Sequence, residues 1–454
     1  MPITYCGGVG VAKQKKSLRK KEMKLPKHLE HINRYAAGID IGSKSHFVAV
    51  PEGTDEQPVR EFSTFTADLE RLAEWLIACG VTTVAMESTG VYWIPVFEVL
   101  ENHGLEVKLV NARHVKNVPG RKSDVPDCQW LQQLHTYGLL HGAFRPADQV
   151  CTLRAYVRQR STLVSGSASY IQRMQKALTQ MNIQLHNVVT DITGSTGMRI
   201  IKAILNGERN PDILAAMRDP RCKNSSATIA RSLKGNYRPE HLFVLQQAVE
   251  LYEIYRTKIA DCDRQILEQL KGFDNSPNDV PPTTVEDALV RMSGVNLTNI
   301  DGIDTTTALK ILSEIGTDMS RWKSSKHFAS WLGLSPGTKV SGGKVLSSAT
   351  KPSTNKASAA LRMAAFTLLN SKSALGAYLR RQRARLGTPK AITATAHKLA
   401  RLIYAMLTHG TAYVDAGQEY YEERYRVRVI QSLKRRAREL GFELVTVQKE
   451  AAAV

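Results

Sequence analysis

Hydrophobic and polar positions in the first third of the chain follow the periods of strands and helices in turn. Residues 35–40 (YAAGID) predict a buried strand, and residues 45–50 predict its return strand after a short turn, so together they predict a hairpin. A strand near residues 59–65 follows, and strands at 82–87 and 107–110 alternate with two helical patterns. This order predicts an α/β layer fold for the N-terminal region.

Apolar residues then repeat every seven positions from about residue 147, which predicts a coiled coil. A second stretch with this pattern follows after a helical segment interrupted by Gly, Asn and Pro. The two long helices are expected to pack antiparallel or to dimerise. The first seam comprises Val157, Val164, Ile171, Met174, Leu178, Met181 and Leu185, and the second comprises Leu245, Ala248, Tyr252, Tyr255, Ile259, Cys262 and Ile266.

The clearest linker is residues 274–282 (DNSPNDVPP), after which short helices alternate with Gly/Ser-rich loops. The chain therefore divides into a basic N-terminal extension (1–34), an α/β domain (35–146), a helical coiled-coil region (147–282), a mainly α-helical domain (283–415) and a basic helical tail (416–454).

Positive charge is concentrated in the mainly α-helical domain. The chain has 62 Lys and Arg against 42 Asp and Glu, and 43% of it is hydrophobic, so it is a folded basic protein. Residues 319–414 contain sixteen Lys and Arg and no acid, which favours a nucleic-acid partner over a merely solvated face. The candidate nucleic-acid-binding residues are Lys339, Lys344, Lys351, Arg362, Arg380, Arg381, Arg383 and Arg385.

Membrane and secreted proteins do not fit this sequence. No stretch approaches the roughly 18 consecutive apolar residues of a membrane span, and no apolar run follows the basic N-terminus. The six cysteines contain no CxxC pair, which argues against a zinc ribbon or a disulfide framework. We expect a cytoplasmic protein, nucleoid-associated in action, with no membrane partner.

Four carboxylates stand where an α/β sheet binds ligands. Asp40 lies in the first hairpin, Glu87 ends a neighbouring strand, and Asp124 and Asp127 share one face of a helix predicted after residues 120–123. Such a set suits hard divalent cations and two-metal phosphodiester chemistry. The alternative for each acid is solvation at the surface.

A serine in the basic domain is the candidate nucleophile. Ser341 lies between Lys339 and Lys344, just before Gly342 and Gly343, so cations are near to stabilise charge on a phosphoryl group. The alternative is a flexible Gly/Ser turn. The loop is not a P-loop, because Gly343 stands where Lys is required, so ATP is not implied.

Two further features support the interpretation less directly. Residues 300–312 (IDGIDTTTALKIL) are similar to a helix-hairpin-helix motif, although Asp304 occupies a usual glycine position and would repel phosphate. His397 and Tyr404 share a helical pattern with apolar neighbours, so packing is expected for both rather than catalysis.

The sequence resembles the DEDD insertion-sequence transposases, which are related to the pilin-gene invertases. The resemblance runs from about residue 35 to 425. It rests on GIDIGS around Asp40, AMESTG around Glu87, KSDVPDCQW around Asp124 and Asp127, and GLSPGTKVSGGK around Ser341, with Cys128 standing where many relatives carry Ala.

The resemblance implies an RNase H-like (RuvC-like) N-terminal domain and a C-terminal serine transposase domain. It also implies that Asp40, Glu87, Asp124 and Asp127 are catalytic residues that bind Mg²⁺, and that Ser341 forms a covalent link to DNA. Implied partners are double-stranded donor and target DNA, a bridge RNA, and further copies of the chain in a dimer or tetramer.

The sequence therefore predicts a transposase that cuts and rejoins DNA. A RuvC-like hydrolytic nuclease and a non-catalytic nucleic-acid-binding protein are the alternatives.

Overall fold

The computed structural model describes residues 31–88, 90–111, 127–273 and 282–445. Its contacts divide the chain into two compact units, residues 1–145 and 146–454. Most of the basic extension, Asp124 and most of the predicted linker lie outside the described residues. No helix in the described parts of the chain is long and apolar enough to cross a membrane.

The first unit contains a five-stranded sheet in the order β3-β2-β1-β4-β5. The strands β1, β2 and β3 are antiparallel, whereas β4 and β5 run parallel to β1. The hairpin of β1 and β2 and the α/β layering agree with the sequence prediction. This topology is compatible with an RNase H-like fold. The strands are β1 (Ala36–Ile41), β2 (Ser45–Ala49), β3 (Val59–Ser63), β4 (Thr83–Glu87) and β5 (Glu106–Val110).

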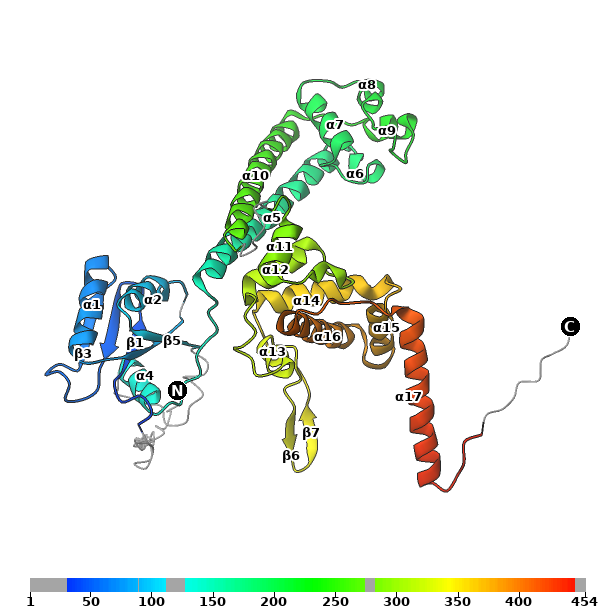
Figure 1. The fold of residues 1–454 in the computed structure, drawn as a ribbon. Coiled ribbons are helices and arrows are strands. Elements are labelled where there is room, and N and C mark those ends of the chain that lie inside the picture. The colour runs from blue at the N-terminus through cyan, green and yellow to red at the C-terminus, as the bar shows by residue number, and fades with distance from the viewer. Residues whose placement is uncertain (1–30, 89, 112–126, 274–281, 446–454) are drawn as a thin grey trace, which may run out of the picture. The chain divides into compact units, whose positions relative to one another are not determined.

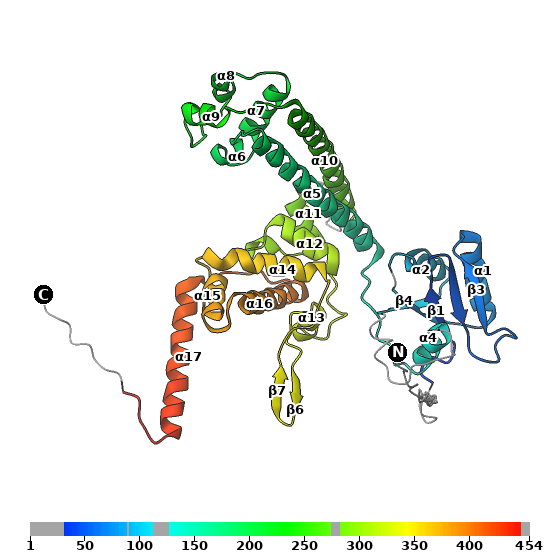
Figure 2. The ribbon, with the colours of Figure 1, turned by 180° about the vertical axis from the view of Figure 1, so that it is seen from behind.

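Helices cover both faces of this sheet (Figures 1 and 2). Alternate strand residues such as Ile39 and Met86 form a core with α1 (Thr66–Ala78) and α2 (Trp93–Asn102). On the other face Ala85 and Val110 form a smaller core with α4 (Asp127–Thr136). Strand side chains alternate between these two cores because successive residues point to opposite faces.

The second unit begins with two long helices that pack antiparallel, α5 (Asp148–Gln180) and α10 (Pro239–Lys271). Gln269 donates a hydrogen bond to the Gln149 main-chain oxygen near one end, and the Tyr170 and Tyr255 rings pack in a tilted arrangement further along. The heptad pattern is only partly followed, because Val164 is 43% exposed. The prediction that the heptad seam continues through Met181 and Leu185 is wrong, because both residues lie beyond the end of α5. The helix stops at Gln180, and Asn182 takes a left-handed conformation.

Met181 and Leu185 instead join a core formed by the far ends of α5 and α10 and the short helices between them. Ile200, Leu214 and Ile229 are fully buried in this core. The short helices are α6 (Leu185–Val188), α7 (Ser195–Leu205), α8 (Pro211–Ala216) and α9 (Ser226–Ser232).

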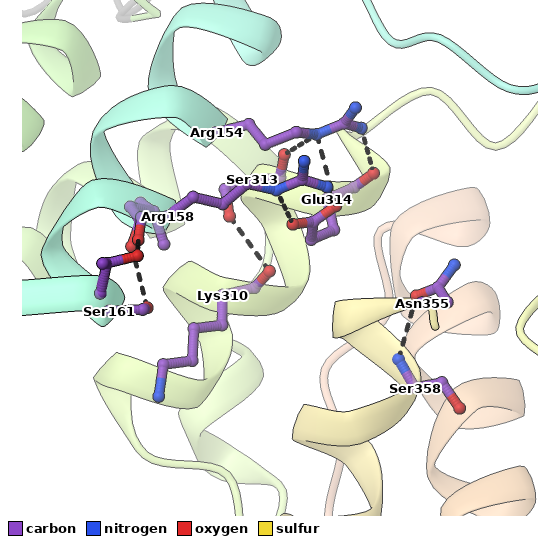
Figure 3. Close-up of polar contacts among 10 residues, drawn as sticks. Arg154, Arg158, Ser161, Lys310, Ser313, Glu314, Asn355 and Ser358 are labelled. Carbon is purple, nitrogen blue, oxygen red and sulfur yellow. Dashed lines mark hydrogen bonds and ion pairs between the residues drawn. The ribbon is translucent and has the colours of Figure 1, made fainter. Parts of the chain in front are cut away.

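A buried carboxylate joins α5 to the helices that follow (Figure 3). The Arg158 guanidinium donates two hydrogen bonds of 2.8 Å to the two oxygens of Glu314, which lies on α12 (Thr305–Ile315). Arg154 donates to the main-chain oxygens of Ser313 and Glu314. Because the Glu314 side chain is only 9% exposed, this bidentate pair fixes α12 against α5.

Among the remaining helices, α13, α14 and α15 pack against α16, whereas α11 packs against α10 and α12, and α17 packs against α15. A two-stranded hairpin lies between α13 and α14. This hairpin is absent from the sequence prediction, which expects only helices and loops here. The elements are α11 (Val285–Ser293), η1 (Leu297–Asn299), α13 (Ser325–Trp331), β6 (Lys339–Ser341), β7 (Lys344–Ser347), α14 (Lys356–Thr367), η2 (Leu368–Asn370), α15 (Ala374–Leu386), α16 (Thr388–His409) and α17 (Gly417–Glu439).

Candidate active site

Two of the predicted acids stand at neighbouring strand ends on the α4 face of the sheet. The β1–β4 register pairs Gly38 with Ala85 and Ile39 with Met86, so the next residues along, Asp40 and Glu87, come level with each other. Ala85 belongs to the core under α4, and side chains two residues apart point to the same face. Glu87 therefore shares this face, as Asp40 does with Gly38.

A glycine lets α4 approach the strand that carries Asp40. A Cβ atom at Gly38 would lie 2.3 Å from the main-chain oxygen of Cys128 and 2.3 Å from the main-chain nitrogen of Gln132. Only hydrogen fits there, so α4 lies directly on β1. This contact sets the first turn of α4, with Asp127, beside Asp40.

Asp40 and Asp127 are close enough for their charges to interact. Burial raises the pKa of the half-buried Asp40 carboxyl, and the charge of Asp127 raises it further. Burial is also the main reason that the pKa of the Cys128 thiol is raised to about 11, and the two carboxylates add to that shift. A cation at this position would relieve the repulsion between Asp40 and Asp127.

Three of the four predicted metal-binding acids lie in the described residues. Asp124 lies outside the described residues, so its place relative to Asp127 stays a prediction. Within the described ranges, no three His, Cys, Asp or Glu side chains form a group that could hold a metal ion. The structure therefore brings two acids together, with Glu87 level with Asp40 on the adjoining strand.

A buried histidine anchors the other end of α4 and was missed by the sequence interpretation. His135 Nε2 lies 2.9 Å from Thr83 Oγ1 at the start of β4, and Asn33 donates a 2.7 Å hydrogen bond to the His135 main-chain oxygen. Burial lowers the pKa of His135 to about 4, with Lys108 contributing, so the ring is neutral at pH 7. His135 thus positions α4, but nothing in the sequence around it signals a partner 52 residues away.

The serine candidate lies at the tip of an exposed hairpin. Ser341 ends β6 and pairs with Lys344 across a two-residue turn, Gly342-Gly343, whose φ angles are +54° and +76°. Two left-handed residues in succession favour Gly at both positions. The sequence predicted the tight turn but not the flanking strands, in which Lys339, Ser341 and Lys344 are all exposed.

The predicted nucleic-acid-binding cations occupy different surroundings. Arg362 donates to Ser358 Oγ and the Gly333 main-chain oxygen, and Arg380 donates to two main-chain oxygens and to Gln418, so both brace the fold. Arg381 lies over the Tyr425 ring. The exposed members are Lys339, Lys344, Lys351, Arg383 and Arg385.

The two supporting features have structural roles. Asp304 caps α12, because its Oδ1 accepts a 2.7 Å hydrogen bond from the Thr307 main-chain nitrogen. The capping role explains why Asp304 stands just before α12. The helix-hairpin-helix assignment stays a prediction. Tyr404 donates to the Trp322 main-chain oxygen and packs on Phe328, as a packing role requires.

Comparison with known proteins matches two regions of the chain to families of transposases. Residues 37–183 match the DEDD transposase domain of the IS110 type, and residues 295–380 match a domain described as transposase IS116/IS110/IS902 family. The first region contains Asp40, Glu87, Asp124 and Asp127, and the second contains Ser341.

A Streptomyces coelicolor protein, described as an uncharacterized 43.6 kDa protein of insertion element IS110, is 33% identical over 119 residues. The aligned segment covers 26% of this chain and 29% of that relative, so the chain matches less than a third of the relative's length.

Proposed function

We propose that this chain is a transposase of the IS110 type, which cuts DNA and rejoins it to move an insertion element. The observation that carries the proposal is the half-buried Asp40, which stands beside Asp127 at a strand end and has a raised pKa. Convergent carboxylates at the edge of such a sheet suit phosphodiester chemistry.

The metal in this proposal is Mg²⁺, held by Asp40, Asp127 and Glu87 together with Asp124. The described pair Asp40 and Asp127 fits this ion, because Mg²⁺ is commonly bound by one or two carboxylates, with waters and phosphate oxygens completing its shell. Bound there, Mg²⁺ would offset phosphate charge and orient the scissile bond. The protein's own part is to keep α4 against β1, which sets the separation of Asp40 and Asp127.

The nucleophile in this proposal is the Ser341 hydroxyl. Its oxygen attacks a DNA phosphorus, a serine–phosphate ester forms, and the bond from phosphorus to one deoxyribose oxygen breaks. The serine proton passes to the released sugar oxygen. A sugar hydroxyl of the joining strand then displaces serine by the reverse reaction, so the number of phosphodiester bonds is unchanged and ATP is not needed. Lys339 and Lys344 are the nearest exposed cations in the hairpin.

The acids and Ser341 belong to different compact units, so their meeting at one phosphate is part of the proposal. The hairpin exposes Val340, Val345 and Leu346 by 58–68%. An isolated two-stranded ribbon is marginally stable in water, so this one is expected to be covered in the working assembly. We propose an assembly of two or four copies on double-stranded donor and target DNA, with a bridge RNA choosing the sites.

Covalent trapping tests the proposal. Labelled element-end DNA is mixed with the full chain, Mg²⁺ and co-purified nucleic acid, and the products are denatured. We expect a protein–DNA adduct that survives denaturation, is lost in Ser341→Ala, and persists in Ser335→Ala, a serine six residues away that precedes the hairpin. Cleaved DNA without any adduct would instead identify a hydrolytic nuclease.

The RNA partner requires a separate test. RNA that co-purifies with the chain is sequenced and mapped to the element. Reads from the element's own flank support a bridge RNA, whereas random cellular RNA argues against one. DNA binding should weaken steeply between low and moderate salt, because bound Lys and Arg displace counterions.

A further inference from the structure

A cavity of about 940 Å³ lies among α15, α16 and α17, away from the hairpin residues. Its walls are rich in tyrosine, including Tyr378 of α15 and Tyr421 and Tyr425 of α17. Cavities of this size hold ligands as large as a nucleotide. Most of the wall comes from α16 and α17, which lie beyond the matched segment 295–380.

The cavity wall is strongly cationic. Lys398, Arg401, Arg424 and Arg428 line it, and no Asp or Glu does so among the described residues. None of these four forms an ion pair with an acid in the described part of the chain. The nearby acid, Asp415, accepts hydrogen bonds from Ala374, Tyr413 and Gly417 instead. Four unpaired cations around one cavity favour an anionic ligand.

Aromatic rings stand beside these cations. The Lys398 ammonium lies 4.7 Å from the centroid of Tyr378 and 5.5 Å from that of Tyr421. The two rings meet edge to face, with centroids 6.2 Å apart. Tyrosine faces next to Lys and Arg provide both a stacking platform for a base and a charge for its phosphate.

The simpler explanation is that the tyrosines only fasten α17 to its neighbours. A fastening helix buries apolar side chains, yet α17 has no buried residue along its 23 positions. Val427 and Ile430 are 46% and 38% exposed, and Arg424 and Arg428 face the cavity from this helix. The contact is therefore aromatic and cationic rather than a closed hydrophobic core.

We propose that this cavity binds one unpaired nucleotide of a nucleic-acid strand. The base stacks on Tyr421, and the adjoining phosphate binds Arg401 and Arg428. This inference rests on the proposed function, because it presumes a nucleic-acid substrate or guide, and it adds a site distant in sequence from the serine hairpin. The same pocket chemistry serves an unpaired base of DNA or of RNA.

Quenching of 2-aminopurine fluorescence tests the site in the full chain. Short single strands of DNA and of RNA, each with one 2-aminopurine, are titrated with wild type, Tyr421→Leu, Tyr421→Phe, Arg428→Gln and Arg426→Gln. Arg426 is an exposed cation of the same helix that does not line the cavity, so its variant is the charge control. Circular dichroism checks that each variant keeps its helices.

We expect quenching in wild type, in Tyr421→Phe and in Arg426→Gln. Binding should weaken roughly tenfold and quenching disappear in Tyr421→Leu, because one stacked base is lost. Arg428→Gln should weaken binding with quenching retained at saturation. The strand type that is quenched more strongly identifies the source of the nucleotide.

Absence of quenching in wild type, or equal quenching in Tyr421→Leu, would overturn the proposal. The covalent trapping assay is run on the same preparations. An adduct without quenching refutes the nucleotide site and leaves the proposed function standing. Quenching without an adduct supports the nucleotide site and argues against the proposed function.

Discussion

The carboxylate edge of the sheet and the serine hairpin differ in what holds them in place. Asp40 is half-buried under a helix that contacts its strand directly at Gly38. Ser341 is exposed at the end of a three-residue strand, and two glycines set its turn. The acids are thus positioned by long-range packing, whereas the serine is positioned by local turn geometry.

Because of this difference, substitutions at the two places should affect stability and activity differently. Substitutions near Asp40 are expected to change both folding and activity, because the same contacts support the core and the site. Substitutions at Ser341 are expected to change activity alone. Four predictions, ordered from the largest change in the free energy of unfolding to the smallest, test that separation.

Gly38→Ala should lower the free energy of unfolding of the first unit by about 3 kcal/mol, because its methyl group overlaps two backbone atoms of α4. Urea denaturation measures the effect. Gly53→Ala is the control, because no atom lies near the position of an added methyl group. Only its φ of +86° disfavours a side chain there, so the expected loss in the free energy of unfolding is about 1 kcal/mol. Equal losses at the two glycines would mean that α4 does not lie on β1 as described.

Glu314→Gln should destabilise the second unit by about 2–3 kcal/mol, because Arg158 loses its bidentate partner. The control is Asp263→Asn, which breaks the exposed Arg160–Asp263 pair and should cost less than about 1 kcal/mol. Thermal unfolding compares the two. If the variants lose the same stability, the α5–α12 contact does not depend on Glu314.

Asp40→Asn should slightly raise stability at neutral pH while reducing adduct formation at least about a hundredfold. The pKa of Asp40 is raised in the folded protein, so protonation stabilises the fold. The stability gained from this protonation is fully present below the pKa of Asp40 in the unfolded chain, and it is lost as pH rises through the pKa of Asp40 in the folded protein. The Asn side chain does not titrate, so the variant lacks this dependence of stability on pH. Unfolding measured from pH 4 to 7 should show a smaller decline for Asp40→Asn than for wild type.

Ser341→Ala should change the free energy of unfolding by less than about 0.5 kcal/mol, because the side chain is exposed and has no described partner. Adduct formation should vanish in the same protein. A clear loss of stability would show that Ser341 supports the hairpin, and the contrast with Asp40 would then fail.

Much of the sheet domain is predictable from the sequence because its signals are local. Alternation and turns locate β1 and β2 to within one residue at each end, and Asp40 falls on β1 as expected. The contact of Gly38 with α4 is not predictable, since it joins positions some 90 residues apart, and only the small residue inside an apolar strand hinted at it.

The second unit shows where periodicity misleads. The heptad continues through Leu185, but the helix ends at Gln180 because the chain turns at Asn182 to build a separate core. Arg362 and Arg380 belong to the basic window by composition, yet each is bound to protein oxygens. Which cations stay exposed depends on tertiary contacts that composition does not encode.

The central claim is that the acids and Ser341 meet at one DNA phosphate in the assembled complex. Fe²⁺ in place of Mg²⁺, with ascorbate and peroxide, releases hydroxyl radicals that cut the nearest backbone. In the DNA-bound assembly we predict cuts beside Asp40 and also in the hairpin at residues 339–344, both lost in Asp40→Asn. Cuts confined to the sheet domain, with the DNA-bound hairpin intact, would contradict the claim.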